Sequence, residues 1–209
     1  MDEVTRNIGK ASKALKEGKT VAFPTDTVFG LGTNAFNEKA VLKIFKIKKR
    51  GIKKPLIINI SNIKMIKDIT MIDKSIYKML KAFWPGKVTF ILNKKKKVLK
   101  NVSGSTNTLA VRIPDCKLTL ELIKKAKCPI VSTSANIEGE KEPLRSYEID
   151  PNLAKEIDII LNRDDIKLSG VPSTIVSLTD AMPRIIRYGE DKIVRKLIKY
   201  MIKFSYRIK

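Results

Sequence analysis

The sequence predicts a single α/β domain, spanning residues 1–209, with a twisted sheet of mixed parallel and antiparallel strands and flanking helices. Segments with helical periodicity alternate with short runs rich in β-branched residues, which is typical of α/β proteins. Three predicted strands cluster near the C-terminus, which indicates that part of the sheet is antiparallel. No Pro-rich or Gly/Ser-rich linker divides the 209 residues, so one sizeable core is expected.

The N-terminal half predicts three helices interleaved with strands. Its first helix is amphipathic and carries acidic residues near its start. Thr-Val-Ala-Phe then predicts a short strand, and Val-Thr-Phe-Ile-Leu predicts a later one. The expected elements are helices near 4–17, 38–47 and 73–82 and strands near 20–23, 56–60, 88–92 and 109–113.

The C-terminal half predicts helices near 117–126 and 190–203, and strands near 129–132, 157–161, 173–178 and 184–188. The last helix is amphipathic, with lysines on one face. Its apolar stripe comprises Ile193, Leu197, Ile198, Met201 and Ile202. Such a helix can lie on a membrane surface, but packing on the sheet is much commoner and is expected here.

The composition excludes several classes of protein. A chain that is 43% hydrophobic and 31% charged is typical of soluble globular proteins, and no apolar run suits a membrane span or a signal peptide. The expected compartment is the cytoplasm, with no membrane partner. Two cysteines are too few for a disulfide framework, and the absence of histidine excludes Ser–His–Asp and Cys–His nucleophiles.

The net charge of +22 indicates attraction to polyanions, with ATP and RNA equally eligible. Of the 43 basic residues, 34 are lysines scattered along the whole chain. AT-biased codon usage or adaptation to heat produces the same pattern. Charge alone therefore slightly favours a general solubility effect over a nucleic-acid function.

The densest chemical signal is the segment 23–32, Phe-Pro-Thr-Asp-Thr-Val-Phe-Gly-Leu-Gly. A strand is predicted to end at Pro24, and the two glycines are interpreted as permitting an irregular backbone. Loops at strand ends are where α/β folds usually bind small ligands. The hydroxyls and amides here could hold an amino acid or a phosphate, and an ordinary turn is the structural alternative. A P-loop is excluded because GxxxxGK[ST] is absent.

Further segments carry weaker signals. Residues 46–56 place six cations between a helix and a strand, which suits a triphosphate or simply a solvated loop. Residues 130–136 follow a buried strand with a hydroxyl-rich turn that can donate to phosphate or cap a helix. Residues 170–176 and 184–189 add hydroxyls and arginines near strand ends.

Together and in this order, these segments resemble the YrdC-like threonylcarbamoyl-AMP synthase family in its short, single-domain form. The resemblance covers about residues 5–190. The matching motifs are Phe23-Pro24-Thr25-Asp26-Thr27, Gly30-Leu31-Gly32, Ile44-Phe45 leading to Lys48 and Arg50, Pro55-Leu56, Phe83-Trp84-Pro85-Gly86, Val111-Arg112-Ile113-Pro114, Ser134-Ala135-Asn136, Pro172-Ser173-Thr174-Ile175 and Arg187-Tyr188-Gly189.

The resemblance implies a basic concave face and a nucleotidyltransferase reaction. Bicarbonate or CO2 carboxylates the amine of L-threonine, and the carbamate attacks the α-phosphorus of ATP and expels pyrophosphate. The product, L-threonylcarbamoyladenylate, passes to a separate transferase complex that forms threonylcarbamoyladenosine-37 in tRNA. Mg2+ is expected to accompany the triphosphate, and no protein-only metal cage is visible in the sequence.

The resemblance also implies roles for particular residues. The family's Lys, Arg, Ser and Asn fall on a catalytic set of Lys48, Arg50, Ser134 and Asn136, meeting at one nucleotide pocket. The two cations are expected to neutralise the triphosphate and the leaving pyrophosphate, and the other two to fix phosphate oxygens. The ATP side adds Lys54, Thr108, Glu142 and Arg187, and the threonine side comprises Thr27, Asn59, Arg112, Ser132 and Ser173. A planar guanidinium such as that of Arg112 matches a carboxylate.

Some positions depart from the family's usual residues. Asp26 stands where Glu is usual, Gly51 where Pro is common, and Asn59 where His is frequent. The last departure bears on the contact with threonine. None of the departures removes the catalytic set.

Two other functions stay open: an RNA-binding protein of the same fold, for duplex RNA or tRNA, and a paralogue without synthase activity. An aromatic content of 6% and the lack of RNA-module motifs disfavour RNA binding as the main role, although weak binding is left open. The retained catalytic set disfavours the paralogue.

Overall fold

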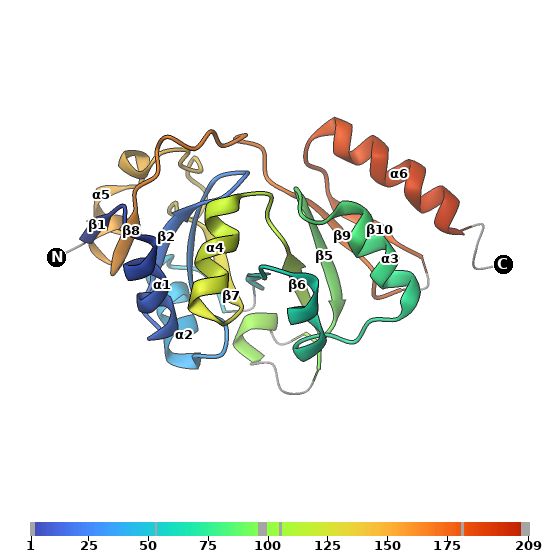
Figure 1. Cartoon of the computed structure of the whole chain (residues 1–209), viewed down its shortest axis with the longest axis horizontal. Coiled ribbons are helices and arrows are strands. Elements are labelled where there is room, and N and C mark those ends of the chain that lie inside the picture. Colours follow the sequence, from blue (N-terminus) through green and yellow to red (C-terminus); the bar gives the residue numbers. More distant parts are fainter. Residues whose placement is uncertain (1–2, 53, 96–99, 105, 181, 206–209) are drawn as a thin grey trace.

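A computed structural model describes residues 3–52, 54–95, 100–104, 106–180 and 182–205 (Figure 1). Ten strands among these residues form one sheet in the order β1-β8-β2-β3-β7-β4-β6-β5-β9-β10. They are β1 (Glu3–Thr5), β2 (Val21–Pro24), β3 (Phe29–Asn34), β4 (Ile57–Asn59), β5 (Val88–Asn93), β6 (Thr108–Arg112), β7 (Ile130–Ser134), β8 (Ile159–Leu161), β9 (Thr174–Ser177) and β10 (Arg184–Arg187).

The helices flank this sheet. The α-helices are α1 (Ile8–Lys16), α2 (Glu38–Ile47), α3 (Lys74–Phe83), α4 (Lys117–Ala126), α5 (Pro151–Lys155) and α6 (Asp191–Ser205), and the short 3-10 helices are η1 (Ile63–Asp68), η2 (Lys100–Ser103) and η3 (Ser146–Glu148). In the described part of the chain, no helix is both long and apolar enough to cross a membrane.

The sheet contains both parallel and antiparallel pairs of strands. The parallel pairs are β1–β8, β8–β2, β4–β6 and β5–β9, and the remaining neighbours run antiparallel. The predicted α/β domain with a mixed sheet and flanking helices is therefore confirmed. The predicted helices near 38–47, 73–82 and 117–126 are also confirmed, each within a residue or two.

The start of the chain differs from the prediction. Glu3–Thr5 forms β1, which pairs in parallel with β8, rather than the first turns of a helix. The helix begins only at Ile8, because the Asn7 side chain accepts the backbone N–H of Lys10 and caps it. A three-residue edge strand is too short to leave a periodicity that a sequence can show.

The glycine-rich segment after Pro24 also differs from the prediction. Only Thr25–Val28 turns, and Phe29–Asn34 continues as the central strand β3, paired with β2 and β7. Gly32 serves close packing rather than an irregular backbone, since a Cβ there would lie 2.6 Å from the carbonyl oxygen of Val131. The short helix α5, in the stretch expected to be merely polar, was also not predicted.

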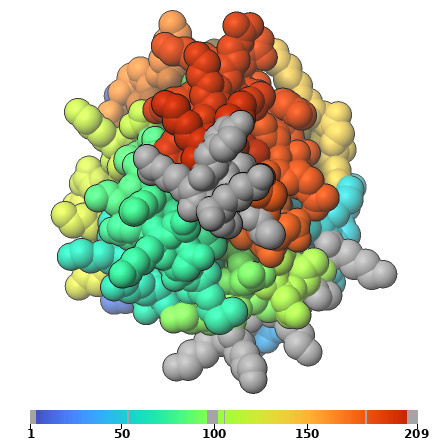
Figure 2. All heavy atoms as spheres, turned by 90° about the vertical axis from the view of Figure 1, so that its right-hand side faces the viewer, coloured from blue at the N-terminus to red at the C-terminus, as the bar shows by residue number. Residues whose placement is uncertain are grey.

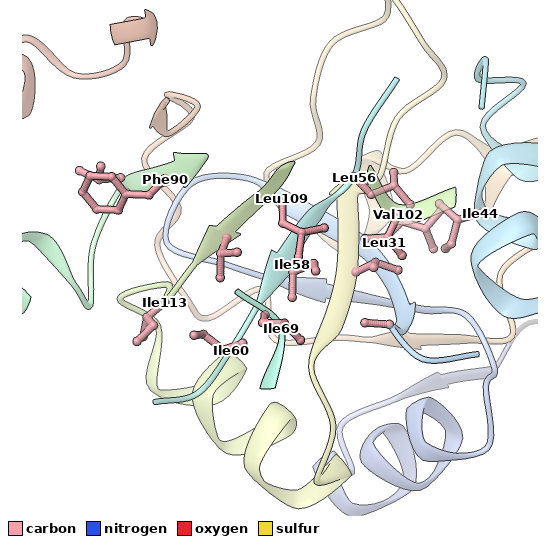
Figure 3. Close-up of a cluster of buried hydrophobic side chains, with 14 of the residues drawn as sticks. Leu31, Ile44, Leu56, Ile58, Ile60, Ile69, Phe90, Val102, Leu109 and Ile113 are labelled. Carbon is pink, nitrogen blue, oxygen red and sulfur yellow. The ribbon is translucent and has the colours of Figure 1, made fainter. Parts of the chain in front are cut away.

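Two hydrophobic clusters hold the elements together. The smaller lies around α1 and α4, which pack against each other beside β2 and β8. Part of the larger is shown in Figure 3, where Leu31, Ile58, Phe90 and Leu109 project from the central strands β3, β4, β5 and β6. All four are essentially inaccessible to solvent. These strands therefore carry the core on one face, which leaves their alternate residues for the other.

The last helix packs at the end of the molecule that also carries α3 (Figures 1 and 2). Tyr200 meets Phe83 of α3 edge to face, with ring centroids 5.4 Å apart, and Leu197 is fully buried. The predicted apolar stripe is partly wrong, because Ile198 and Ile202 are about half exposed. Residues 193, 197, 200 and 201 make the buried face instead, which leaves 198 and 202 on its flank.

Candidate active site

A cavity of about 450 Å3 lies on the face of the central strands opposite the larger hydrophobic cluster. Ile58 of β4 points into the core, so its neighbours Ile57 and Asn59 point the other way. In β6, Ala110 pairs with Ile57 and Arg112 pairs with Asn59, so the same face continues across both strands. The cavity therefore has a sheet floor whose side chains alternate with those of the core.

Most of the predicted site residues line this one cavity, although they come from segments far apart in the sequence. They are Thr27, Arg50, Lys54, Asn59, Arg112, Ser132, Ser134, Glu142, Ser173 and Arg187. Three predicted residues do not line it. Lys48 and Asn136 lie behind Ser134, and Thr108 stands at the start of β6, on the same face as Ala110 but outside the lining.

Lys48 contacts the Ser134-Ala135-Asn136 turn, as predicted from the sequence, but its amino group uses all of its hydrogen bonds within that turn. It donates to the carbonyl oxygen of Ser134 at 2.7 Å, to Oδ1 of Asn136 at 2.8 Å and to the carbonyl oxygen of Asn136. The three N–H groups of an ammonium match these three acceptors. With 2% of its surface exposed, Lys48 supports this turn from outside the cavity lining.

The environment of Lys48 makes its charge sensitive to pH. Burial lowers the pKa of Lys48 to about 8, and the positive charge of Arg50 acts in the same direction. Glu142, Glu138 and Glu140 oppose this shift. The amine is therefore still protonated at neutral pH, as the three acceptors require.

Ser134 and Asn136 form a network of their own above Lys48. The Ser134 hydroxyl donates to Oδ1 of Asn136 at 2.7 Å, and Nδ2 of Asn136 donates to the carbonyl oxygen of Glu140 at 2.6 Å. The backbone N–H of Ala135 donates to the carbonyl oxygen of Phe29 in β3. The turn is thus fixed from three sides, and Ser134 is the member that reaches the cavity.

Arg50 carries an unused hydrogen-bond donor at the cavity. Its Nη2 donates to the carbonyl oxygen of Pro55 at a long 3.3 Å, and its buried Nε–H has no partner. Among the described residues, this is the one buried side-chain nitrogen or oxygen without a hydrogen bond. An unpaired buried donor is costly, so its presence at a cavity indicates a place for an incoming acceptor.

Lys54 also stands at this end of the cavity, where it is exposed and paired with Glu138. The pKa of Glu138 lies below its usual value because of the hydrogen bond from Lys54. Lys53, another of the cations in this basic segment, lies outside the described residues.

Arg112 is the most deeply buried of the cations that line the cavity, with 5% of its surface exposed. Its Nη2 reaches both carboxylate oxygens of Asp26 at 2.7 and 2.6 Å, its Nε donates to the carbonyl oxygen of Gly86, and its Nη1 donates to the Thr27 hydroxyl at 3.2 Å. Burial lowers the pKa of Arg112 from its usual value, and Asp26 opposes that shift. The contact of Asp26 with Arg112 was not predicted from the sequence.

Other polar side chains of the cavity also form hydrogen bonds within the protein. Nδ2 of Asn59 donates to the Ser132 hydroxyl at 2.6 Å. Arg187 donates through Nε and Nη2 to the carbonyl oxygen of Ser173, whose hydroxyl also contacts that of Thr89 at 2.8 Å. Burial lowers the pKa of Arg187, and Glu142 opposes this.

An apolar floor of the cavity was missed by sequence reasoning. Its members are single aliphatic side chains, each from a different strand or loop: Val28, Pro55, Ile57, Ile91, Ala110, Pro172, Ile175 and Ile186. Ile57, Ala110 and Ile91 stand side by side in register across β4, β6 and β5. The signal available in the sequence was the alternation of such residues with Asn59 and Arg112, which looks the same as that of an ordinary half-buried strand.

Other parts of the molecule are less suited to chemistry. Cavities of about 620 and 790 Å3 lie beside α1 and α3, but they are lined largely by lysines and surface carboxylates. Within the described residues, no three His, Cys, Asp or Glu side chains gather closely enough to hold a metal ion. The cavity on the sheet therefore joins several cations, hydroxyls and amides that suit a phosphorylated substrate and a small carboxylate.

Comparison with known proteins points the same way. The Sua5_yciO_yrdC family, described as "Telomere recombination", matches residues 13–189. The threonylcarbamoyl-AMP synthase of Pyrococcus abyssi is 37% identical over 180 residues, which cover 86% of this chain and 53% of that protein. The enzyme of the same name from Bacillus subtilis is 37% identical over 193 residues, covering 90% of this chain and 56% of the relative. The chain thus spans about half the length of these curated relatives.

Solved structures share the fold. The crystal structure of P. abyssi Sua5 complexed with L-threonine superposes with a TM-score of 0.85 and 34% identity, over 95% of this chain and 60% of that one. Full-length HypF in a phosphate- and nucleotide-bound form gives a TM-score of 0.76 and 27% identity, over 88% of this chain and 29% of HypF.

Proposed function

Because this chain belongs to the Sua5/YciO/YrdC family, we propose that it is a threonylcarbamoyl-AMP synthase. Its substrates are then ATP, L-threonine and bicarbonate or CO2, and its products are L-threonylcarbamoyladenylate and pyrophosphate. One observation carries the proposal. A single cavity joins Arg50, whose buried Nε–H lacks a partner, to a polar end built around Arg112. The family relatives named above bear the same activity in their names.

The threonine end of the cavity is built around Arg112, Asn59 and Ser132. The guanidinium supplies positive charge for the amino-acid carboxylate, and the Asn59–Ser132 pair supplies a donor and an acceptor for other polar groups of the substrate. Thr27 and Ser173 add hydroxyls at the same end. A site that pairs each polar group of its ligand discriminates strongly against analogues lacking that group.

The ATP end uses Arg50, Lys54, Ser134 and Arg187, which line the cavity together with Glu142. The partnerless Nε–H of Arg50 is a donor available to phosphate oxygens, and the Ser134 hydroxyl can donate to one if it turns from Oδ1 of Asn136. The apolar row of Ile57, Ala110 and Ile91 offers a flat surface on which a purine ring can lie. Mg2+ is part of the ATP substrate in this proposal, bound chiefly by its phosphates.

The chemistry requires positioning and charge neutralisation rather than a covalent nucleophile. The threonine amine attacks the carbon of bicarbonate or CO2 and loses a proton, giving a carbamate, with water as the second product if bicarbonate reacts. A carbamate oxygen then attacks the α-phosphorus, and the bond to the β-phosphate oxygen breaks. Arg50 and Lys54 stabilise the negative charge that gathers on pyrophosphate. Lys48 acts one layer further back, holding Ser134 and Asn136 in place.

The product of this reaction is an activated carbamoyl adenylate. We propose that a separate tRNA threonylcarbamoyl transferase complex in the cytoplasm takes it to adenosine-37 of tRNA. Thr108 belongs to the ATP side only if the bound nucleotide extends past Ala110 along β6, since it stands outside the cavity lining.

The function is tested by incubating the purified protein with ATP, L-threonine and bicarbonate. We expect pyrophosphate release that depends on threonine, with an adenylate product detected by mass spectrometry. L-Serine and L-valine, each sharing part of the threonine side chain, serve as matched controls. Threonine-independent hydrolysis, or none, together with tight binding to duplex RNA or tRNA, would replace this function with RNA binding by the same fold.

A further inference from the structure

We propose that Asp26 is a positioning residue, which orients Arg112 toward the carboxylate of the amino-acid substrate. The inference rests on the proposed function and extends it to a residue outside the expected site. Asp26 and Arg112 come from the β2–β3 turn and the end of β6, and their side chains are 8% and 6% exposed. Burying an ion pair is costly, because both charges are removed from water. Its presence next to a substrate cavity therefore indicates a functional role.

The hydrogen bonds of Arg112 show what the pair achieves. A guanidinium has five N–H donors in one plane. The two on Nη2 are directed to the carboxylate of Asp26, the one on Nε donates to Gly86, and one on Nη1 donates to Thr27. One N–H on Nη1 is left, on a side chain that lines the substrate cavity. Asp26 thereby sets both the plane of the guanidinium and the edge that a substrate meets.

Asp26 acts on the substrate only through Arg112. Its own side chain is absent from the lining of the substrate cavity and instead lines two other cavities, of about 440 and 460 Å3, which we call the rear cavities. Asp115 and Lys167 line both of these rear cavities as well. Arg112 therefore stands between the carboxylate of Asp26 and the place where a substrate carboxylate binds.

Two effects of Asp26 on substrate binding oppose each other, and this makes the inference testable. As a negative charge beside Arg112, it weakens the attraction of any anion to that guanidinium. As a hydrogen-bond partner, it holds the guanidinium in a single orientation, so less ordering is needed when the substrate arrives. The positioning role predicts that removing Asp26 weakens threonine binding, whereas the charge effect alone predicts that binding tightens.

The main experiment compares Asp26→Asn with wild type in steady-state assays and in calorimetric titration with L-threonine. We expect the KM and Kd for threonine to rise about tenfold or more, whereas kcat at saturating threonine and the KM for ATP change little. Asp115→Asn is the matched control, because Asp115 lines the same rear cavities and is exposed; it should behave as wild type. Asp26→Glu keeps the carboxylate and should restore most of the threonine affinity. An unchanged or lower threonine KM in Asp26→Asn overturns the inference.

A double-mutant cycle covers the case in which Asp26→Asn alone leaves Arg112 unpaired and unfolds the protein. Arg112→Gln removes the buried charge, so Asp26→Asn is tolerated more easily in that background. There it should leave the threonine KM unchanged, because Asp26 has lost the group through which it acts. A further rise in KM in that background would show that Asp26 acts by another route.

A substrate-free measurement separates this inference from the proposed function. In 15N spectra of the arginine side chains, wild type should show a slowly exchanging Nε–H for Arg112, held by Gly86, and Asp26→Asn should lose that protection. Protection without threonine turnover in wild type would refute the synthase function but keep the positioning of Arg112. Equal exchange in wild type and Asp26→Asn would refute the positioning even if the enzyme is active.

Discussion

Arg112 lies almost completely buried at one end of the cavity with each of its three nitrogens bonded to protein, whereas Arg50 lies half-buried at the other end with its Nε–H unpaired. The neighbours follow the same division. Asn59 and Ser132 are buried and hydrogen-bonded to each other, while Lys54 is exposed and shares an ion pair with Glu138. One end is preformed, and the other keeps an unsatisfied donor.

This difference suits two unlike ligands. A small amino acid has few groups by which it can be recognised, so its site benefits from rigid partners whose orientation is set in advance. A triphosphate brings several charges and its own Mg2+, and can tolerate cations that move to meet it. The comparison predicts that mutations at the Arg112 end affect folding and binding together, and that mutations at the Arg50 end affect turnover alone.

Replacing Arg112 with Met should give the largest effect on stability. It leaves the buried carboxylate of Asp26 without its partner, so the free energy of unfolding should fall by about 3 kcal/mol or more. Urea denaturation followed by circular dichroism measures this change. Arg163→Met is the control, since the side chains of its pair with Asp165 are 35% and 50% exposed and the pair should contribute little. Equal stability of the two variants would contradict the idea of a preformed end.

Arg50→Ala should change turnover and leave folding intact. We expect a loss of about 2 kcal/mol of transition-state stabilisation, which is roughly a thirtyfold fall in kcat/KM for ATP. Urea stability should change little, because the Nε–H that is removed has no partner in the free protein and the bond from Nη2 to Pro55 is long. Lys49→Ala, one position earlier and exposed, is the control. If Arg50→Ala turns over normally, phosphate binding has been assigned to the wrong residue.

Lys48 is expected to affect both stability and activity, and these two effects depend on pH in opposite directions. Burial lowers its pKa to about 8 in the folded protein, against 10.5 for an ordinary lysine, so the unfolded chain binds more protons between these values. Over that range the free energy of unfolding should therefore rise with pH in wild type relative to Lys48→Met. Activity should instead fall above pH 8, as the neutral amine loses one of the hydrogen bonds that hold the turn.

The measurement for Lys48 is a pH series of urea unfolding and of kcat/KM for wild type and Lys48→Met. The variant should lack the additional pH dependence in both quantities and should be about as impaired at neutral pH as Arg50→Ala. If kcat/KM of Lys48→Met still falls above pH 8, a group other than Lys48 causes that fall.

Asn59→Ala should have the smallest effect. It removes one buried hydrogen bond to Ser132, worth about 1 kcal/mol, and should raise the threonine KM about fivefold with the ATP KM unchanged. Asn152→Ala, at an exposed position on α5, serves as the control. If Asn59→Ala changes the KM for ATP instead, Asn59 belongs to the ATP end of the cavity.

Local patterns predicted much of this molecule well. The helices near 38–47, 73–82 and 117–126 carry strong 3.6-residue periodicity, and the strand containing Arg112 lies within one residue of its prediction. Where these predictions failed, the cause was pairing with other strands of the sheet. Glu3–Thr5 becomes a strand only because β8 lies beside it, and Phe29–Asn34 becomes a central strand because β2 and β7 pair with both of its edges.

For the candidate site, too, the sequence predicted some features and missed others. Ordered motifs in the sequence were enough to select Arg50, Ser134, Arg112 and most of the other polar residues that line the cavity. They could not distinguish a residue that faces the cavity from one that supports it. Lys48 and Arg50 are two positions apart, yet one amine is held beneath the turn while the other side chain reaches the cavity.

By itself, the sequence determined the fold class, the set of chemical groups and their order along the chain, because these follow from periodicity, composition and motif spacing. Only the tertiary structure decided which groups are paired. Whether a cation keeps a free donor depends on neighbours brought from distant strands, as Asp26 is brought to Arg112 while no acceptor is brought to the Nε–H of Arg50. Hydrogen-bond partnership is a property of three-dimensional contact, and no local pattern encodes it.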